Sequence, residues 1–510
     1  MKKLKKIRIA VSLAFFLLLT AFFTDVSGCL PRQLSVLEQI QFLPSLLSFN
    51  LGMVGFWLIA SFLFGRVYCS TVCPMGTFQD FFGRLGKKIR KKKNARYRFS
   101  PAKNILRYSL LTMTAFSLCA GVVAFPALID PYSAYGRIVV AFVRPLTAWI
   151  HNTAATDSTL LLTVDVVLPG AVGLSVAALT AVIVGFLAFR NGRTFCNTVC
   201  PVGATLSLCS RSSIWRMEID TDKCINCHRC EYACKAACID LSDHVVDMSR
   251  CVLCFNCVDV CNDDAITYTP NRRRAATPLM QRIKERAAVG SASPAMDVMI
   301  KEKKKAVPDA SRRRFLSFVG TAAVTGSLAN AADGIRQAEA AAKGRVPVNR
   351  RRAVTPPGTE SRDDFLRRCT SCQLCVSKCP QQVLRPAVTE YGILHPMQPY
   401  MDFEVSFCRE ACNLCTTVCP TGALRPLSVE EKKTAAIGKA KFLLQNCVTQ
   451  TDSVNCGACS RKCPAEAITM VGYNNTEIPQ IDESACTGCG KCEYVCPATP
   501  YKAIYVEGIE

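Results

Sequence analysis

The chain has 510 residues, a formal net charge of +23, 32 cysteines, 50% hydrophobic residues and a mean hydropathy of +0.19. So many cysteines in so long a chain argue against a small disulfide-bonded secreted domain and indicate metal ligation, and the hydrophobic content indicates a part-membrane protein. The basic residues gather in 2–8, 84–103 and 272–305, beside apolar segments, so we attribute the charge to membrane topology and expect no nucleic-acid partner.

Four apolar stretches are long enough to cross a bilayer of ~30 Å as helices. They are Ile7–Phe23, Leu43–Gly65, Ile105–Ile129 and Val166–Phe189, and none contains Asp, Glu, Lys or His. No small-x-small cleavage site follows the first, so we interpret it as an uncleaved anchor and not a signal peptide. The sequence therefore predicts an all-α membrane domain of four transmembrane helices over residues 1–215.

The orientation follows from the Lys and Arg counts on either side of these stretches. The Met1–Arg8 tail carries five, the loop between the first two helices has one, ten lie in 84–103 and two lie in 130–165. Cytoplasmic loops carry the excess of Lys and Arg. We therefore expect the N-terminus inside, four crossings, and the chain back inside by residue 190.

Two near-identical motifs, Cys69-Ser-Thr-Val-Cys73-Pro74 and Cys196-Asn-Thr-Val-Cys200-Pro201, directly follow the second and fourth predicted helices. Their matched placement predicts that the four thiols meet in space. Three roles remain open: a shared metal or redox site, a redox-active pair beside a quinone pocket, or an element that begins helices. Cys29, Cys119, Cys209 and Cys238 fit no motif; Cys119 is expected to pack inside a helix.

Two cysteine runs with the C-x2-C-x2-C-x3-C spacing of bacterial ferredoxins lie in a predicted cytoplasmic two-cluster domain over 216–270. They are Cys224, Cys227, Cys230, Cys234 and Cys251, Cys254, Cys257, Cys261. Because the fourth cysteine ligates the partner cluster in such pairs, Cys261 is expected to complete the first site and Cys234 the second. The embedded C-x-x-C-H, Cys224–His228, matches haem attachment, but a complete run around it disfavours haem.

A basic linker is predicted over 271–310 and another linker over 334–364. Between them, Ser311-Arg312-Arg313-Arg314-Phe315-Leu316 and the apolar residues after it resemble a twin-arginine export signal. The segment 311–333 is either such a signal or a fifth membrane helix. A small-x-small site at Ala329-Asn330-Ala331 leaves open whether the chain is cut there, and the C-terminal part of the chain is predicted to be periplasmic.

Residues 365–510 contain four further runs, each followed by proline. They are Cys369, Cys372, Cys375, Cys379; Cys408, Cys412, Cys415, Cys419; Cys447, Cys456, Cys459, Cys463; and Cys486, Cys489, Cys492, Cys496. Zinc knuckles do not require such repeated spacing. The runs predict a periplasmic α+β ferredoxin-like domain with four 4Fe–4S clusters, which makes six in the chain. Spacing leaves open whether the first run exchanges its fourth ligand with the second or with the fourth.

The first 270 residues resemble the NapH family of membrane polyferredoxins, through the apolar helices, the C-x3-C-P motifs and the two-cluster domain. Residues 311–510 resemble the NapG/MauM family, through the export signal and four cysteine runs. The resemblance implies a fused quinol dehydrogenase of the bacterial inner membrane. It implies electron transfer from the quinone pool to a periplasmic reductase or cytochrome, periplasmic nitrate reductase above all.

In that interpretation Cys69, Cys73, Cys196 and Cys200 belong to the catalytic region, and Asp130 is a candidate proton acceptor, with His151 and Asp165 as alternatives. No glycine-rich nucleotide fingerprint is present, so NAD(P)H and ATP are not expected. The alternative is an accessory factor that supplies electrons to mature or reactivate a metalloenzyme. Electron flow in the reverse direction, from cytoplasmic ferredoxin to quinone, also remains open.

Overall fold

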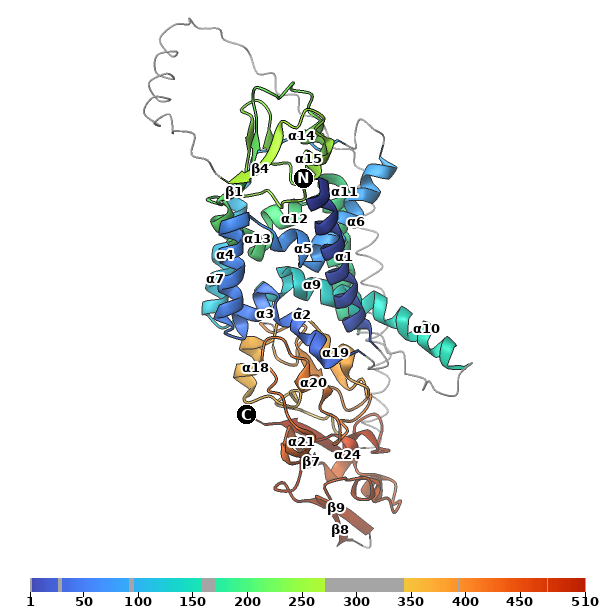
Figure 1. The fold of residues 1–510 in the computed structure, drawn as a ribbon. Coiled ribbons are helices and arrows are strands. Elements are labelled where there is room, and N and C mark those ends of the chain that lie inside the picture. The colour runs from blue at the N-terminus through green and yellow to red at the C-terminus, as the bar shows by residue number, and fades with distance from the viewer. Residues whose placement is uncertain are drawn as a thin grey trace, which may run out of the picture.

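The computed structural model describes residues 2–25, 30–90, 96–156, 170–270, 344–392, 394–474 and 476–509. These residues form an elongated molecule of three parts (Figure 1). A cysteine-rich lobe, residues 215–270, lies at one end and is called the N-terminal lobe. The helix domain, residues 2–213, lies in the centre, and the cysteine-rich C-terminal domain, residues 344–509, lies at the other end. The predicted linker 271–310, the export-like segment 311–333 with Ala331, residues 334–343, Cys29 and Asp165 lie outside the described residues.

The central domain contains a helix at each predicted membrane span. These are α1 (Lys2–Thr24), α4 (Leu51–Phe64), α7 (Asn104–Cys119) and α11 (Ala171–Asn191). Among the described helices, α1 and α11 are long and apolar enough to cross a membrane by length and composition. Four uninterrupted spans are therefore not confirmed.

The other two predicted spans are broken for local reasons. In the second, Phe49 has φ 56° and the Asn50 side chain accepts a hydrogen bond from Met53 N, so α3 (Phe42–Leu47) ends and α4 begins anew. In the third, Gly121 has φ 76° and separates α7 from α8 (Ala124–Ile129). Cys119, expected inside a helix, is the exposed last residue of α7.

The segment 130–165, between the third and fourth predicted spans, is not an irregular loop as far as residue 156. It is helical: α9 (Pro131–Ile138), a π-helical turn η2 (Val139–Val143) and α10 (Arg144–Thr156) follow one another. Asp130 caps α9 by accepting from Ser133 N, and Pro131 occupies the first helical position. Every residue of α9 is buried, whereas α10 extends away from the body (Figure 1).

The central domain also contains the following elements. They are η1 (Arg32–Ser35), α2 (Val36–Gln39), α5 (Tyr68–Thr71), α6 (Pro74–Ile89), α12 (Thr194–Thr198) and α13 (Pro201–Ser210). Large apolar side chains on the long helices are exposed, among them Ile59, Phe62, Ile105, Phe116, Leu179, Val182 and Phe186. Apolar surface of this extent suits contact with lipid.

Both cysteine-rich parts are built from very short helices and two-stranded antiparallel sheets, which confirms their α+β ferredoxin character. In the N-terminal lobe, β1 (Trp215–Ile219) pairs with β4 (Ile266–Pro270) and β2 (Ile239–Asp240) with β3 (Val245–Val246), beside α14 (Arg229–Ala233) and α15 (Asn256–Val260). The C-terminal domain pairs β5 (Leu384–Pro386) with β6 (Pro399–Met401), β7 (Gly438–Phe442) with β10 (Ile504–Gly508), and β8 (Ile468–Tyr473) with β9 (Thr476–Ile481).

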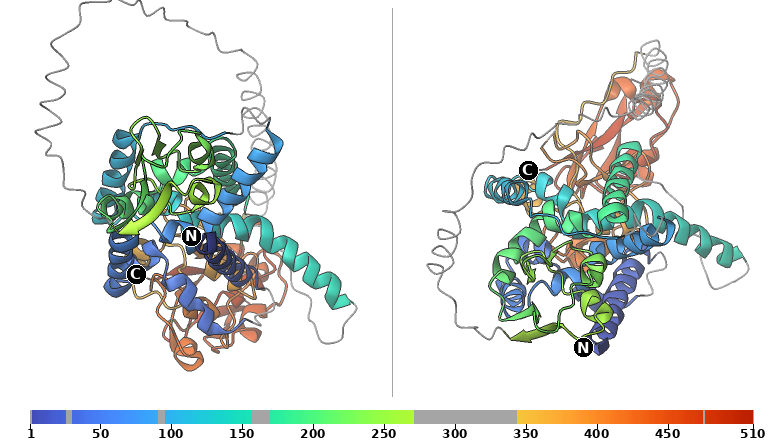
Figure 2. Two further views of the ribbon diagram at one scale, coloured as in Figure 1. Left: turned by 45° about the horizontal axis from the view of Figure 1, so that its top comes forward. Right: turned by 90° about the horizontal axis from the view of Figure 1, so that it is seen from above.

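The helices of the C-terminal domain are α18 (Arg362–Arg368), α19 (Leu374–Lys378), α20 (Leu414–Thr417), α21 (Val429–Thr434), η3 (Leu444–Asn446), α22 (Val448–Thr451), α23 (Ala458–Arg461) and α24 (Lys491–Tyr494). One packed core runs through the helix domain and includes Cys254 of the N-terminal lobe together with Cys372, Leu374 and Val418 of the C-terminal domain. The two cysteine-rich parts therefore both pack on the helix domain, at opposite ends of it (Figures 1 and 2).

Candidate iron–sulfur and redox sites

In the N-terminal lobe, the cysteines group as the spacing predicts. Cys224, Cys227, Cys230 and Cys261 line one small cavity. Cys257 interacts electrostatically with Cys251, Cys254 and Cys234, which form the second group. Each group thus takes three thiols from one run and the fourth from the other.

The C-terminal domain shows which of its runs exchange. One cavity is lined by Cys447, Cys456, Cys459 and Cys496, and another by Cys463, Cys486, Cys489 and Cys492. The first two runs exchange their fourth cysteine in the same manner, as their electrostatic interactions show. Cys375 interacts with Cys369 and Cys372 of its own run and with Cys419 of the second. Cys415 interacts with Cys408 and Cys412 of its own run and with Cys379 of the first. Between the two open possibilities, the geometry favours exchange of the first run with the second and of the third with the fourth.

The loops suit a cubane cluster in their backbone conformation. In the four runs with regular spacing, the residues just before and just after the second cysteine have positive φ: Asn226 and His228, Leu253 and Phe255, Ser371 and Gln373, Gly488 and Gly490. Two left-handed residues turn the chain so that three thiols lie on one side. In the described residues, no three His, Cys, Asp or Glu side chains converge closely enough for a single metal ion.

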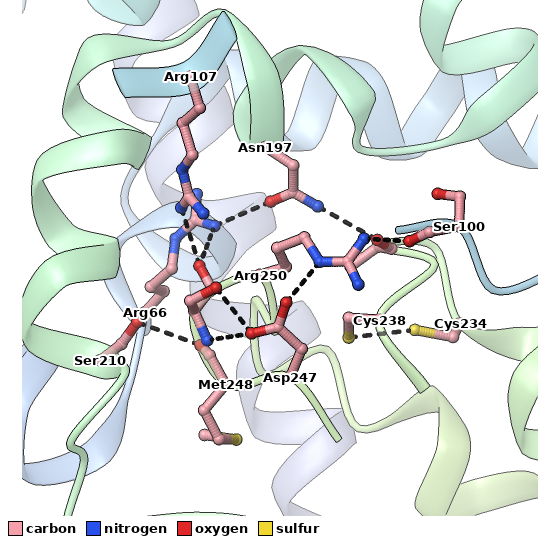
Figure 3. A network of polar contacts seen from close by, with 12 residues as sticks. Arg66, Ser100, Arg107, Asn197, Ser210, Cys234, Cys238, Asp247, Met248 and Arg250 are labelled. Atoms are coloured by element: carbon pink, nitrogen blue, oxygen red, sulfur yellow. Dashed lines mark hydrogen bonds and ion pairs between the residues drawn. The ribbon is translucent and has the colours of Figure 1, made fainter. Parts of the chain in front are cut away.

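Cys238, to which the sequence assigned no role, lies beside the second N-terminal group. Its sulfur is 3.5 Å from the Cys234 sulfur (Figure 3), and this contact lowers the pKa of Cys234 to about 7. It also interacts with Cys251 through a hydrogen bond. Hydrogen bonds to ligand sulfurs tune cluster potentials, so Cys238 is a candidate tuning residue. In the sequence, the only signal for this tuning role is that Cys238 lies four residues after Cys234.

The structure brings the two C-x3-C-P motifs together, as predicted. Cys69, Cys73, Cys196 and Cys200 are all buried and belong to the core of the helix domain. Cys200 interacts electrostatically with each of the other three thiols. Sequence reasoning overlooked two arginines, Arg66 and Arg193, which occupy the same position three residues before each motif and are fully buried.

A cavity of about 510 Å³ lies between α1, α6 and α9 with its continuation η2. Its wall is mostly apolar and aromatic, with Phe16, Phe78, Phe81 and Phe82. Two hydrogen-bonded pairs supply polar groups: Ser12 with Thr77 at 2.7 Å and Thr20 with Tyr135 at 2.5 Å. This size and composition are typical of a site for a ring-bearing apolar ligand. π-helical turns such as η2 are frequent at functional sites.

Asp80 connects this cavity with the four-cysteine site. Its carboxylate lies in the cavity wall and accepts from Arg193 Nε at 2.8 Å, and Arg193 donates in turn to the Cys69 carbonyl at 2.8 Å. The cavity and the thiols are therefore only two side chains apart.

Asp130 is a buried helix cap, not a solvated loop residue. Burial raises its pKa to about 6, against the opposing hydrogen bond from Ser133. It does not line the cavity between α1 and α6. His151 lies in α10 and is half-buried.

Glu38, which sequence reasoning did not select, is fully buried, and neither carboxylate oxygen has a hydrogen-bond partner among the described residues. Burial raises its pKa well above the usual range, and Lys378 opposes this. Its electrostatic neighbours include Tyr132 and the predicted cluster ligand Cys372. Glu38 is thus a buried carboxyl group between the helix domain and the first C-terminal site.

The N-terminal lobe is held to the helix domain by buried arginines (Figure 3). Arg66 and Arg107 both donate to the Ser249 carbonyl, at 3.2 and 2.9 Å, and Arg250 donates to the Ser100 carbonyl at 2.6 Å. At the opposite end, Lys378 pairs with Asp25 at 2.7 Å. Both contacts position predicted cluster sites against the helix domain.

Family models of iron–sulfur domains match both C-x3-C-P segments and both cysteine-rich parts of the chain. Family models described as "4Fe-4S binding domain" match residues 47–93, 172–217 and 215–236, and models described as "4Fe-4S dicluster domain" match 368–424 and 454–499. The first dicluster match spans both runs of the first exchanging pair, and the second spans the other pair except Cys447.

The ferredoxin-type protein NapG of Escherichia coli is 34% identical over 205 residues, 38% of this chain and 84% of that protein. The methylamine utilization ferredoxin-type protein MauM of Methylorubrum extorquens is 33% identical over 152 residues, 28% of this chain and 68% of that protein. MauM of Paracoccus denitrificans is 30% identical over 153 residues, 28% of this chain and 67% of that protein. No solved structure matches.

Proposed function

The chain belongs to the family of NapG- and MauM-type ferredoxins and is an iron–sulfur electron-transfer protein, and from this premise we propose that it is a quinol dehydrogenase module of the bacterial inner membrane. In this proposal it oxidises membrane quinol and delivers the electrons to a periplasmic reductase or cytochrome, with a nitrate reductase as the first candidate. The observation that carries the proposal is the placement of predicted cluster sites at both ends of one apolar helix domain.

Six 4Fe–4S clusters are proposed at the 24 cysteines of the six runs. When bound, such clusters carry electrons one at a time. The chain's own residues hold them in the three-plus-one arrangement described above. The site nearest the helix domain on the C-terminal side includes Cys372, whose backbone carbonyl lies against Gly136 of the buried α9. That contact supports electron exchange between the helix domain and the C-terminal domain.

We place the quinol in the cavity lined by Phe16, Phe78 and Tyr135. Quinols are apolar rings with two hydroxyl groups, which the aromatic wall and the two hydrogen-bonded hydroxyl pairs suit. Oxidation releases two protons with two electrons, so a proton acceptor is required. Asp130 and Glu38 are buried carboxyl groups outside the cavity wall, so either would receive the proton through intervening groups. Both are electrostatic neighbours of Tyr132, and Glu38 also of Cys372, on the side of the C-terminal sites.

The test uses the full chain in proteoliposomes, with a short-chain quinol as electron donor and the iron–sulfur absorbance and EPR signals as readout. Rapid reduction by quinol, abolished by Tyr135→Trp, which fills the cavity, supports the proposal. Reduction by a cytoplasmic ferredoxin but not by quinol would instead favour reverse flow. Intact clusters that neither donor reduces would favour the accessory-factor alternative.

Amide variants distinguish the two candidate proton acceptors, Asp130 and Glu38. Asp130→Asn keeps a helix cap, since Asn caps as well as Asp, but removes a proton acceptor. Glu38→Gln does the same for the other candidate. We expect the variant at the true acceptor to slow quinol-dependent reduction roughly 100-fold, the usual contribution of general base catalysis, without changing reduction by dithionite.

A further inference from the structure

Four buried polar side chains lie where the helix domain meets the C-terminal domain, and we call them the interface polar group. They are Glu38, Asp130, Tyr132 and Arg137, and each is 0% or 1% exposed. In the part of the chain that the structure describes, both Glu38 oxygens, one Asp130 oxygen and the Tyr132 hydroxyl have no hydrogen-bond partner. The same is true of Nε and Nη1 of Arg137. Polar atoms without partners are thus concentrated at this interface.

The interface polar group is assembled from two elements that are distant in the chain. Glu38 belongs to α2, whereas Asp130 caps α9 and the other two side chains belong to α9 itself. Tyr132 has both Glu38 and Asp130 as electrostatic neighbours, and Arg137 interacts with Asp130. Tyr132, Glu38 and Arg137 also interact with Cys372 of the first C-terminal run. The four side chains are therefore close together, beside the C-terminal domain.

Protein partners satisfy this group only in part. Arg137 Nη2 donates to the Leu128 carbonyl at 3.0 Å, and the second Asp130 oxygen accepts from Ser133 N at 2.8 Å. Among the described residues, neither these two side chains nor Glu38 has a further partner. A buried polar atom without a hydrogen bond is costly, and a buried charge without one costs more. Proteins satisfy such groups with ordered water, which typically makes about three hydrogen bonds.

Helix α9 connects the interface polar group with the cavity that we assign to quinol. Tyr132 and Tyr135 are three residues apart and therefore lie on one face of the helix. Both rings pack on α1, with centroids 5.8 Å apart for Tyr132 and Phe23 and 5.3 Å apart for Tyr135 and Phe16. Tyr135 and Phe16 line the cavity. About one turn of helix thus separates the cavity wall from the interface polar group.

We propose that ordered water occupies the interface polar group and conducts the protons of quinol oxidation towards the C-terminal domain, an inference that rests on the proposed function. Quinol becomes quinone when its two O–H bonds break and two electrons and two protons leave. The electrons go to the periplasmic acceptor. The protons enter the water between Asp130 and Glu38 and leave on the side of the C-terminal domain. Carboxyl groups and water chains are established proton carriers in proteins.

The presence of water is tested by hydroxyl-radical footprinting of the full chain in detergent, in which X-rays generate radicals from water beside a side chain. Tyr132 is expected to be oxidised several-fold faster than Tyr68, although both are 1% exposed. Tyr68 is the matched control, because its hydroxyl donates to Gln41 Oε1 at 2.8 Å and is satisfied by the protein. Equal protection of the two tyrosines overturns the proposal.

A pair of variants tests whether Glu38 holds this water. Glu38→Leu removes both acceptor oxygens and is expected to lower the oxidation rate of Tyr132 towards that of Tyr68. The matched control is Glu360→Leu, the same substitution at an exposed position, which is expected to change neither rate. An unchanged rate in Glu38→Leu overturns the assignment of water to Glu38. If this variant does not fold, the comparison of the two tyrosines in the unaltered chain decides by itself.

The direction of proton release is measured in proteoliposomes whose C-terminal domain faces outwards, with a pH-sensitive dye either outside or in the lumen. Reduction by a short-chain quinol is expected to acidify the outer medium. Acidification of the lumen alone overturns the proposal, because the protons would then leave beside the N-terminal lobe. Footprinting uses no quinol. A chain that quinol does not reduce would contradict the proposed function, whereas footprinting would still decide whether water occupies the interface polar group.

Discussion

At the scale of single residues, Asp80 holds the most concentrated charge of the helix domain. Its carboxylate pairs with Arg8 and Arg193, each at 2.8 Å, and with Lys235 at 3.0 Å. The three cations come from α1, from the segment after α11 and from the N-terminal lobe. Burial disfavours the charged carboxylate, but Arg193, Lys235 and Arg8 outweigh it and hold the pKa of Asp80 well below its usual range. This one side chain therefore connects three parts of the fold.

Asp80→Asn leaves three buried cations without their anion, and loss of one partner of a buried ion pair costs about 3–5 kcal/mol. We expect a loss of that order, measured by denaturant unfolding in detergent. Because the folded pKa is depressed, the contribution of Asp80 is present above about pH 4, the unfolded value, and is lost as the pH falls below it. The control is Asp220→Asn, whose partner Lys223 is exposed. It should change stability by less than about 1 kcal/mol.

Cys238 provides a second prediction at this scale. Its thiol lies between the sulfurs of Cys234 and Cys251, which are assigned to the same cluster. A hydrogen bond to a ligand sulfur stabilises the reduced cluster, so Cys238→Ala is expected to make one potential more negative while the iron content stays unchanged. Redox titration followed by EPR measures this. Loss of iron from the variant would show instead that Cys238 is a ligand.

At the scale of elements, α9 is the helix that joins the helix domain to the C-terminal domain. All its residues are buried, and Gly136 allows the Cys372 carbonyl to approach: a Cβ there would lie 2.6 Å from that oxygen and 2.9 Å from the Phe23 ring. The Asp130-Pro131 pair signals a helix start, but a count of basic residues placed it in an outer loop. Hydropathy alone does not distinguish a polar loop from a helix whose polar groups are buried.

Gly136→Val is expected to separate the C-terminal domain from the helix domain, because neither the Cys372 backbone nor the Phe23 ring can move far in a packed core. The measurement is quinol-driven reduction of each cluster group: the C-terminal signals should be reduced at least about 10-fold more slowly, and the N-terminal signals should not change. Gly55→Ala in α4, where a Cβ meets nothing within 4 Å, is the control. Equal slowing of the N-terminal and the C-terminal signals would contradict the role of Gly136 in joining the helix domain to the C-terminal domain.

At the scale of the whole molecule, the predicted cluster sites occupy opposite ends of an apolar helix domain (Figure 1). This arrangement is compatible with the predicted topology, in which the Lys and Arg counts place the first ferredoxin lobe inside and the export-like segment places the C-terminal domain outside. It also gives a reason for the export-like residues 311–333 in the middle of the chain. They lie between the two parts that we assign to different sides of the membrane.

Reporter fusions test this topology. Alkaline phosphatase, which is active only outside the cytoplasm, is expected to be inactive when fused after Pro270 and active when fused after Glu510. Substitution of Arg312, Arg313 and Arg314 by Lys should abolish the activity of the second fusion, since a twin-arginine signal requires arginine. Immunoblotting of both halves shows whether the chain is cut near Ala331. Activity of the first fusion would place the N-terminal lobe outside.

The sequence by itself determined the local features of this protein. The x2, x2 and x3 intervals within each cysteine run predicted loops that wrap three thiols to one side, because such a turn depends only on neighbouring residues. The same holds for α1 and α11, which follow from long uninterrupted apolar stretches. Ligand exchange in the N-terminal lobe also followed, since only one partner run lies nearby.

Tertiary structure decided everything that depends on residues distant in the chain. The exchange of runs in the C-terminal domain, the burial of α9, and the crossed contacts of Arg66 and Arg193 with the opposite C-x3-C-P copy all depend on how elements pack. Spacing encodes the geometry within a loop, but it does not encode which loop lies opposite. That choice depends on the packing of the whole chain into one continuous core.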